Sequence, residues 1–258
     1  MGMEKRNRQQ RWLEISQILR NQSVVQIAEL ATRFGVSTET ARRDIDGMAE
    51  QGLLIRSYGG AAALQTADEP DLAQRTTMLV KERQRIAEEA MGLVRDGDVL
   101  MIDASATCVH FARMLALHRK RLTIVTNSFA VANALSANAG IEVLMLPGRF
   151  DDHENASFGS QSIQYLHNFQ ADLCVSSCGA LTVEGPTEVN SDVASLKRTM
   201  IERSRYTVLL VDHSKLGPGK LEKVCKLGDV RHIIFDTQPR EELVSAIQSS
   251  GAMLVVAE

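Results

Sequence analysis

Small polar residues recur directly after short apolar runs in the C-terminal two-thirds of the chain, and their types suit the binding of an anion. The clusters are Asp103–Thr107, Thr126–Ser128, Gly148–Arg149, Ser176–Gly179 and Asp212–Lys215. A loop of small residues followed by a helix offers backbone N–H groups and a helix dipole to a phosphate. Each cluster alone is equally well an N-cap or a turn without a ligand. Five of them at one edge of a sheet favour a binding pocket.

Nine residues in these clusters are candidates to contact a phosphorylated ligand. They are Asp103, Ser105, Thr107, Asn127, Ser128, Gly148, Arg149, Gly179 and Lys215. Asp103 would accept hydrogen bonds from ligand hydroxyl groups, while Thr107, Asn127 and Lys215 would hold the phosphate. The alternative for Lys215 is a solvated surface lysine, since most lysines are exposed.

A second group of residues, between positions 37 and 48, suits contact with DNA. On a helix, Ala41, Ile45 and Met48 fall on one apolar stripe, and Glu39 and Arg43 point to the opposite side. A helix that presents guanidinium groups from its N-terminal half can enter a major groove, where arginine pairs with guanine. The alternative is a solvated helix face that happens to carry arginines.

The elements that would position these residues favour DNA binding. Amphipathic patterns predict helices over residues 11–20, 25–34 and 38–51, with Gly35 ending the second and Ser37 capping the third. Two short helices joined by a three-residue turn are a helix-turn-helix. Residues 53–56 and 61–64 predict a hairpin, the wing of a winged helix. The DNA-contacting candidates are Ser37, Thr38, Glu39, Thr40, Arg42, Arg43, Arg56, Tyr58 and Gly59.

The remainder of the chain alternates between apolar runs and amphipathic segments of helical length. The runs are Val99–Ile102, Leu122–Val125, Val143–Leu146, Leu173–Ser176, Thr207–Val211, Ile233–Phe235 and Met253–Val256. This alternation predicts an α/β fold with a doubly wound, largely parallel sheet, which binds ligands beyond the carboxyl ends of its strands. We therefore expect a winged helix-turn-helix domain over residues 1–64, a linker over 65–77, and an α/β domain over 78–258 that senses an effector and forms oligomers.

Composition excludes several classes of protein. Apolar residues make up 44% and charged residues 24%, as in ordinary globular proteins. No stretch approaches the roughly 18 apolar residues of a membrane span, and Met1–Gln10 is polar and basic. Residues 1–60 hold nine Lys/Arg against seven Asp/Glu, and the remainder holds 20 against 25. We expect a cytoplasmic protein with no membrane contact, and the mildly basic N-terminal part is compatible with nucleic-acid binding.

Metal and cofactor sites are not predicted. Cys174 and Cys178 lie four residues apart, but no second Cys/His pair with ligand spacing accompanies them, so structural thiols are favoured. The acidic run Asp151–Glu154 suits a solvated loop better than a metal site.

Specific residues in both parts match a known family. The matches are Arg11, Ile15, Leu19, Ala28, Gly35–Ser37, Thr40–Asp44, Gly52, Gly59 and Gly60. With the run Gly-Val-Ser-x-x-Thr-x-Arg-Arg-Asp, residues 6–64 resemble the winged helix of the DeoR family of bacterial regulators. The resemblance continues through the second domain, whose fold in the family resembles that of ribose-phosphate isomerases. It implies a repressor of a carbohydrate operon that binds double-stranded operator DNA and responds to a phosphorylated sugar.

Four residues in three motifs depart from the family pattern. Ser105 and Ala106 stand where the first loop of the family has glycine and a hydroxyl residue, and Arg149 stands where a second glycine follows Gly148. Leu181 replaces the aspartate of a Gly-x-Asp motif. These departures predict ligand contacts that differ from the usual ones, and Arg149 could supply a new one.

Two functions remain open at this stage. A regulator needs no catalysis, and one winged helix contacts so short a half-site that we expect a homodimer or homotetramer. The alternative is a sugar-phosphate isomerase with a DNA-binding head, which needs a carboxylate base in the pocket. Residues 177–183 contain no acid, and Asp103 remains a possible base. An activator instead of a repressor also stays open.

Overall fold

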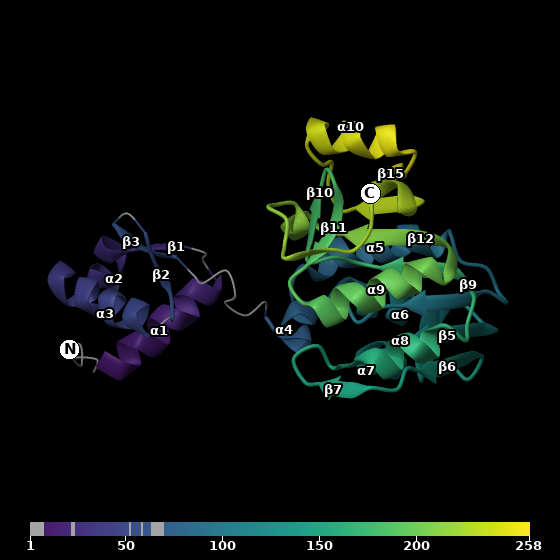
Figure 1. The fold of residues 1–258 in the computed structure, drawn as a ribbon, viewed down its shortest axis with the longest axis horizontal. Helices are drawn as coiled ribbons and strands as arrows, with labels where there is room; N and C mark the ends of the chain where they lie inside the picture. The colour runs from purple at the N-terminus through teal and green to yellow at the C-terminus, as the bar shows by residue number, and fades with distance from the viewer. Residues whose placement is uncertain (1–7, 22–23, 52, 58, 63–69) are drawn as a thin grey trace. The chain divides into compact units, whose positions relative to one another are not determined.

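The chain divides into two compact units, Met1–Asp71 and Leu72–Glu258, each with its own core (Figure 1). The structure is a computed structural model that describes residues 8–21, 24–51, 53–57, 59–62 and 70–258.

The first unit contains the three helices that the periodicity predicts. They are α1 (Arg8–Asn21), α2 (Ile27–Phe34) and α3 (Thr38–Glu50). Ile15, Leu30 and Ile45, one from each helix, are buried together. Gly35 ends α2 with φ of 64°, a left-handed conformation that glycine adopts without steric cost.

A small antiparallel sheet completes this unit, in the order β1 (Val24–Gln26), β3 (Gly60–Ala62), β2 (Ile55–Ser57). The hairpin of β2 and β3 is the predicted wing. The sequence did not predict β1, because its two valines continue the apolar pattern of α2. Pairing with β3 draws this segment into the sheet, so the expected helix from residue 25 begins only at Ile27.

Seven parallel strands form the central sheet of the second unit. Their order across the sheet is β15 (Met253–Val256), β14 (His232–Phe235), β12 (Ser204–Val211), β9 (Ala171–Ser176), β4 (Val99–Ile102), β5 (Leu122–Thr126) and β6 (Ile141–Met145). Each of the seven predicted apolar runs lies in, or within one residue of, one of these strands.

Helices cover both faces of this sheet, as the continuous apolar strands require. On one face α5 (Val80–Met91), α6 (Ala106–His118) and α7 (Phe129–Leu135) pack against Leu100 and Ile102. On the other, α8 (Ser160–Leu166) and α9 (Ser191–Glu202) pack against Met101, and α10 (Glu241–Ser250) packs further along. The fold is therefore doubly wound (Figure 1).

The chain order of the strands places a switch point between β4 and β9. From β4 the chain moves outward through β5 and β6, and then returns to β9 on the other side of β4. Doubly wound sheets bind their ligands beside such a point, beyond the carboxyl ends of the strands.

Short elements surround this edge. The hairpin of β7 (Arg149–Asp151) and β8 (Ala156–Phe158) follows β6. A second small sheet joins β10 (Ala180–Thr182), β11 (Gly185–Glu188) and β13 (Glu222–Lys223). The 3-10 turns η1 (His213–Lys215) and η2 (Leu227–Asp229) lie between β12 and β14 in the chain.

The expected linker over residues 65–77 is too long. Residues 72–77 instead form helix α4 (Leu72–Thr77), which belongs to the second unit. Leu72 is buried in the main core, and the Leu72 N–H donates to the carbonyl oxygen of His153 at 2.9 Å. A single apolar anchor among polar residues leaves no periodic pattern in the sequence, which is why α4 was missed.

Candidate functional site

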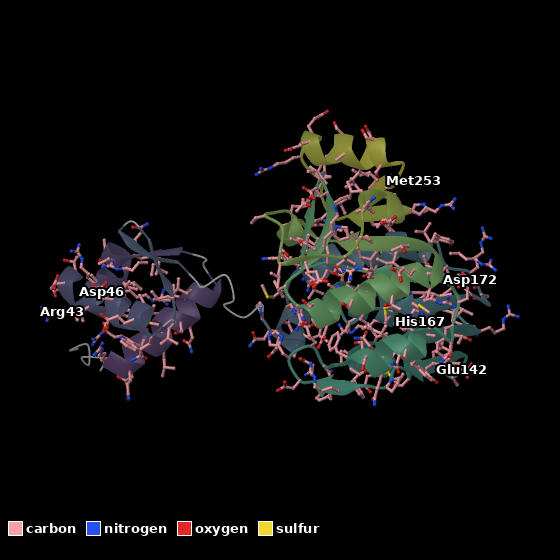
Figure 2. All side chains as sticks on the ribbon, in the orientation of Figure 1. Arg43, Asp46, Glu142, His167, Asp172 and Met253 are labelled. Atoms are coloured by element: carbon pink, nitrogen blue, oxygen red, sulfur yellow. The ribbon has the colours of Figure 1, made fainter. Side chains whose placement is uncertain are left out.

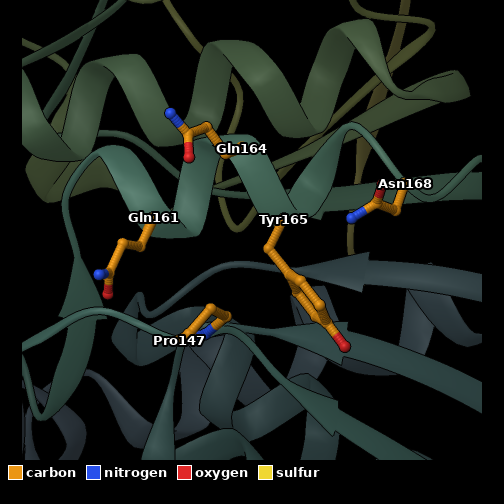
Figure 3. Close-up of a pocket in the computed structure, with 5 residues that line it drawn as sticks. All are labelled: Pro147, Gln161, Gln164, Tyr165 and Asn168. Atoms are coloured by element: carbon orange, nitrogen blue, oxygen red, sulfur yellow. The ribbon is translucent and has the colours of Figure 1, made fainter.

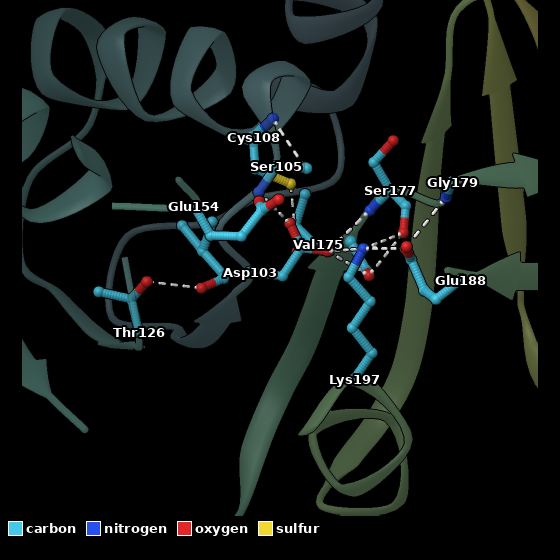
Figure 4. A network of polar contacts seen from close by, with 12 residues as sticks. Asp103, Ser105, Cys108, Thr126, Glu154, Val175, Ser177, Gly179, Glu188 and Lys197 are labelled. Atoms are coloured by element: carbon cyan, nitrogen blue, oxygen red, sulfur yellow. Dashed lines mark hydrogen bonds and ion pairs between the residues drawn. The ribbon is translucent and has the colours of Figure 1, made fainter. Parts of the chain in front are cut away.

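Lys197 is the centre of a buried polar network at the carboxyl ends of β4 and β9 (Figure 4). Its Nζ atom lies 3.0 Å from Asp103 Oδ2 and 2.6 Å from Glu188 Oε1. The same ammonium group donates to the carbonyl oxygen of Ser177 at 2.8 Å. Three oxygen partners match the three N–H donors of a lysine, so the group is saturated within the protein.

Asp103 accepts several further hydrogen bonds in this network. Ser176 Oγ donates to Oδ2 at 2.6 Å, and the backbone N–H groups of Ser177 and Ser105 donate at 3.0 and 2.8 Å. Burial alone would raise the pKa of Asp103, but the charge of Lys197 and these hydrogen bonds lower the pKa to about 2. Asp103 is thus a fixed anion that holds the two loops of the switch point together.

Glu188, in β11, extends the polar network to the hairpin of β10 and β11. The Gly179 N–H donates both to Glu188 Oε1 and to the carbonyl oxygen of Thr187, each at 3.0 Å. Burial lowers the pKa of Lys197, but Asp103 and Glu188 outweigh it and raise that pKa well above its ordinary value. The Gly179 N–H therefore faces partners inside the protein, although the sequence suggested a ligand contact there.

Ser105 and Thr107 lie at the start of α6, directly beside this network. Ser105 is the N-cap of α6, and its Oγ accepts from the Cys108 N–H at 3.4 Å. Thr107 is buried in the first turn. The N-terminus of α6 therefore opens at the switch point, as the sequence predicts.

Asn127 and Ser128, at the end of β5, contact the β7–β8 hairpin. Asn127 Nδ2 donates to the carbonyl oxygen of Ser157 at 3.2 Å, and Ser128 Oγ caps α7 by accepting from Val131 N–H. The amide oxygen of Asn127 is buried and has no hydrogen-bond partner among the residues that the structure describes. Toward a ligand, Asn127 therefore offers an acceptor, which suits a hydroxyl group better than the phosphate that we assigned to it.

Gly148 and Arg149 have structural partners of their own. A Cβ atom at Gly148 would lie 2.6 Å from the carbonyl oxygen of Phe158, so only glycine fits there. Arg149 is exposed and pairs with Asp192 at 3.2 Å and with Asp151 at 3.7 Å. Arg149 thus joins β7 to the first turn of α9, the helix that carries Lys197.

A second buried ion pair lies at the end of β12. Arg83 Nε lies 2.9 Å from Asp212 Oδ2, and both side chains are almost fully buried. Burial alone would raise the pKa of Asp212, but Arg83 and hydrogen bonds from Ser214 lower it. Lys215 ends the following turn η1, and its positive charge also lowers the pKa of Asp212. A hydrogen bond to Asp236 raises the pKa of His213, the first residue of that turn.

Three of these residues, Arg83, Glu188 and Lys197, were not among the sequence candidates, and Asp212 belonged to a predicted cluster without a ligand contact of its own. Two left a signal that we overlooked. Arg83 falls between Leu79 and Ile86, and Lys197 between Ala194 and Met200, so each cation interrupts the apolar stripe of its helix. A charged residue on a buried stripe needs a partner, which marks it as part of a polar network.

A shallow cavity of about 280 Å³ lies apart from these networks, lined by Pro147, Gln161, Gln164, Tyr165 and Asn168 (Figure 3). Its lining carries no charge and offers no cation to a phosphate. Among the described residues, no group of three or more His, Cys, Asp or Glu side chains could hold a metal ion. Burial raises the pKa values of the Cys174 and Cys178 thiols, as expected for structural cysteines. Within the same residues, no helix is long and apolar enough to span a membrane.

In the first unit, α3 presents the predicted DNA-contacting side chains to solvent. Ala41, Ile45 and Met48 are buried, while Thr38, Glu39, Arg42 and Arg43 are exposed. Arg43 projects outward from the helix (Figure 2) and lies 3.1 Å from Glu39. Ser37 caps α3, and its Oγ accepts from the Thr40 N–H at 3.1 Å.

Of the three predicted DNA contacts in the wing, the structure describes Arg56 and Gly59. Arg56 pairs with Asp46 of α3 at 2.5 Å, with both side chains about 40% exposed, so the wing is tied to that helix. Gly59 lies in the turn with φ of 74°, which requires glycine. Tyr58 lies outside the described residues.

Asp44, the aspartate of the Arg-Arg-Asp run, has a structural role. It is buried and accepts hydrogen bonds from Arg11 Nε at 2.6 Å and from Trp12 Nε1 at 3.1 Å. A Cβ atom at Gly47 would lie 2.8 Å from the Trp12 ring. Asp44 and Gly47 therefore set the close approach of α1 to α3, and Asp44 is turned away from the exposed arginines.

Known protein families match residues in both units of the chain. Residues 11–67 match the DeoR-like helix-turn-helix domain, and residues 79–237 match the DeoR C-terminal sensor domain. The HTH-type transcriptional repressor CsqR of Escherichia coli K12 is 30% identical over 244 residues, which cover 94% of this chain and 93% of CsqR. The glycerol-3-phosphate regulon repressor of Escherichia coli K12 is 29% identical over 231 residues, covering 89% and 91% of the two chains.

Among solved structures, D-ribose-5-phosphate isomerase in complex with phospho-erythronic acid matches with a TM-score of 0.41 and 14% identity. The match covers 54% of each chain. The family matches span both units, and the relatives span nearly the whole chain. The chain therefore belongs to the DeoR family of transcriptional regulators.

Proposed function

We propose that the protein is a cytoplasmic repressor of a carbohydrate-metabolism operon, and that a phosphorylated sugar weakens its binding to operator DNA. One observation carries the proposal. The same chain joins an exposed, arginine-bearing helix of a winged helix-turn-helix to a parallel sheet whose switch point gathers polar groups around a helix N-terminus. The names of its relatives, which include a glycerol-3-phosphate regulon repressor, support it.

Thr38, Glu39, Arg42 and Arg43 would contact the operator in the major groove. Arg56 and Gly59 of the wing would contact the DNA beside that groove. Exposed guanidinium groups near a helix N-terminus can pair with guanine edges or with phosphates. The ion pair between Arg56 and Asp46 would hold the wing against α3 during this contact. Ser37 and Thr40 act as the cap that fixes the start of α3.

The candidates for effector contact lie at the carboxyl ends of β4, β5 and β12. The N-terminus of α6, with Ser105 and Thr107, would receive the phosphate, and Lys215 would add a cation. The Asn127 amide oxygen would accept from a sugar hydroxyl. Asp103 and Lys197 would hold the loops after β4 and β9 in place, because each charge is already paired with the other.

The test is a thermal-shift screen followed by operator titration. A phosphorylated sugar at about 100 times its dissociation constant should add roughly 2.7 kcal/mol of stability. The same compound should then release the protein from operator DNA, and the unphosphorylated sugar should not. If no phosphorylated sugar stabilises the protein or releases the DNA, the proposed effector class is wrong.

We infer that the sensor unit does not isomerise sugar phosphates. An isomerase needs a carboxylate that can take a proton. Asp103 and Glu188, the buried carboxylates at the switch point, are both engaged by Lys197, and the Asp103 pKa of about 2 makes it a very weak base. Incubation with aldose and ketose phosphates should give no interconversion, and a measured turnover would favour the enzyme instead.

A further inference from the structure

Arg83 holds the junction between α4 and α5 while it pairs with the end of β12. Its NH1 group donates to the carbonyl oxygens of Arg75, in α4, and of Met78, the latter at 3.1 Å. Its Nε group donates to Asp212 Oδ2 at 2.9 Å. One buried guanidinium group therefore connects the first helix of this unit with the carboxyl edge of the sheet.

The junction that Arg83 holds contains a strained residue. Leu79, between α4 and α5, adopts φ of 50° and ψ of 38°, and it makes no side-chain cap to α5. A left-handed conformation is unfavourable for a leucine, because its Cβ atom crowds the backbone. Such a residue persists only where its surroundings hold it, so the backbone at Leu79 is poised to relax once those contacts weaken.

Two further contacts tie α4 to the β7–β8 loop and to α6. Arg75 NH2 lies 2.5 Å from Glu154 Oε2, in the loop between β7 and β8. The His110 ring, in α6, lies 3.0 Å from the carbonyl oxygen of Thr76. α4 is the first element after the DNA-binding unit in the chain, so the sensor unit connects to that unit along the chain through α4.

We propose that Arg83 is the positioning residue that couples effector binding to the DNA-binding unit, by releasing or holding the strained junction at Leu79. This proposal rests on the proposed function, since it assumes an anionic effector near Asp212 and Lys215. An anion at the η1 turn competes with Asp212 for the guanidinium group of Arg83. The hydrogen bonds from Arg83 to the carbonyl oxygens of Arg75 and Met78 then weaken. As a result the backbone at Leu79 leaves its left-handed conformation, and α4 shifts.

The first test needs no effector. Hydrogen exchange of the backbone amides of residues 72–80 is measured in Arg83→Gln, in Arg83→Lys and in the matched control Arg205→Gln. Arg205 pairs with Asp172 at 3.3 Å at the amino edge of the same sheet, away from the junction. Exchange at 72–80 should rise at least fivefold in Arg83→Gln, rise less in Arg83→Lys, and stay unchanged in Arg205→Gln. Equal exchange in all three proteins would overturn the proposal, whatever the effector is.

A second pair of variants covers the case in which Arg83→Gln fails to fold. Leu79→Gly removes the conformational strain, whereas Leu79→Ala truncates the side chain to its Cβ atom and keeps the strain. The glycine variant should exchange about fivefold more slowly at residues 72–80 than the alanine variant. Equal or faster exchange in Leu79→Gly would show that the junction stores no strain and would also overturn the proposal.

The third measurement tests the coupling itself. Operator affinity is measured by fluorescence anisotropy with glycerol 3-phosphate, glucose 6-phosphate, fructose 6-phosphate and ribose 5-phosphate in turn. Allosteric factors are commonly about 5- to 150-fold. Arg83→Lys, whose junction is already loosened, should bind the operator more weakly than wild type and show little further release by the sugar phosphate, and Leu79→Gly should need about fivefold more sugar phosphate than Leu79→Ala. Normal release by Arg83→Lys contradicts the coupling role, whereas failure of every sugar phosphate on wild type contradicts only the proposed effector class.

Discussion

The ammonium group of Lys197 lies 3.0 Å from the carboxylate of Asp103, and both side chains are more than nine-tenths buried. This pair bridges α9 to the end of β4 across the switch point. The pair stabilises the folded state, because either charge buried without the other would raise its free energy.

Replacement of Lys197 by Met should destabilise the sensor unit by about 3–5 kcal/mol, since Asp103 and Glu188 would remain buried without their cation. Chemical denaturation gives the change in the free energy of unfolding. Lys120→Met removes an exposed lysine and serves as the control, with an expected change below about 0.5 kcal/mol. A loss in Lys197→Met no larger than in the control would show that the network contributes nothing to stability.

Acid should weaken the sensor unit through Asp103. Because its folded pKa of about 2 lies below the ordinary value of 3.8, Asp103 contributes stability that is present above pH 4 and lost as the pH falls toward 2. The shift corresponds to about 2 kcal/mol. Unfolding free energies between pH 5 and pH 2 should fall less steeply in Asp103→Asn than in wild type. Parallel pH profiles would contradict the assignment.

Arg43→Ala and Arg42→Ala should weaken specific operator binding without unfolding the first unit, because neither exposed side chain supports the core. A lost bidentate contact to a base costs about 1–3 kcal/mol, and a lost phosphate contact mainly reduces the salt dependence. Affinity is measured at several fixed salt concentrations, with Arg205→Ala of the sensor unit as the control. Unchanged affinity in both variants would remove α3 from the interface.

Asp44→Ala should destabilise the helix-turn-helix unit by about 3 kcal/mol, because it leaves Arg11 and Trp12 without their buried acceptor. The matched control is Asp46→Ala, since Asp46 pairs with Arg56 near the surface and such pairs contribute less than about 1 kcal/mol. Thermal unfolding followed by circular dichroism compares the two. Similar melting temperatures for both variants would argue against the clamp between α1 and α3.

We expect the protein to assemble as a homodimer or homotetramer through residues 72–258, because a single helix-turn-helix contacts too short a half-site for specificity. Light scattering at micromolar concentration should give the mass of two or four chains of 28.4 kDa. Footprinting should show repeated or palindromic half-sites. A monomer protecting one half-site is the result that rejects this expectation.

The sequence by itself determined the elements whose stability is local or periodic. Gly35, Ser37 and the stripe of Ala41, Ile45 and Met48 specify the second and third helices, because caps and helical periodicity act within a few residues. The seven apolar runs specify the strands of the central sheet, since strands buried on both faces need continuous apolar residues. The motif around Arg42 and Arg43 indicated both the family and the DNA-binding function.

Only the tertiary structure decided how distant residues pair. Asp44 is acidic in the middle of a DNA-binding motif, and its role became evident only where Arg11 and Trp12 meet it from α1. Lys197 meets Asp103 across 94 positions of the chain, and Arg83 meets Asp212 across 129. Such buried ion pairs depend on which strands become neighbours. That neighbourhood is set by packing of the whole sheet and leaves only an indirect mark in the sequence: a single charge on an otherwise apolar helix face.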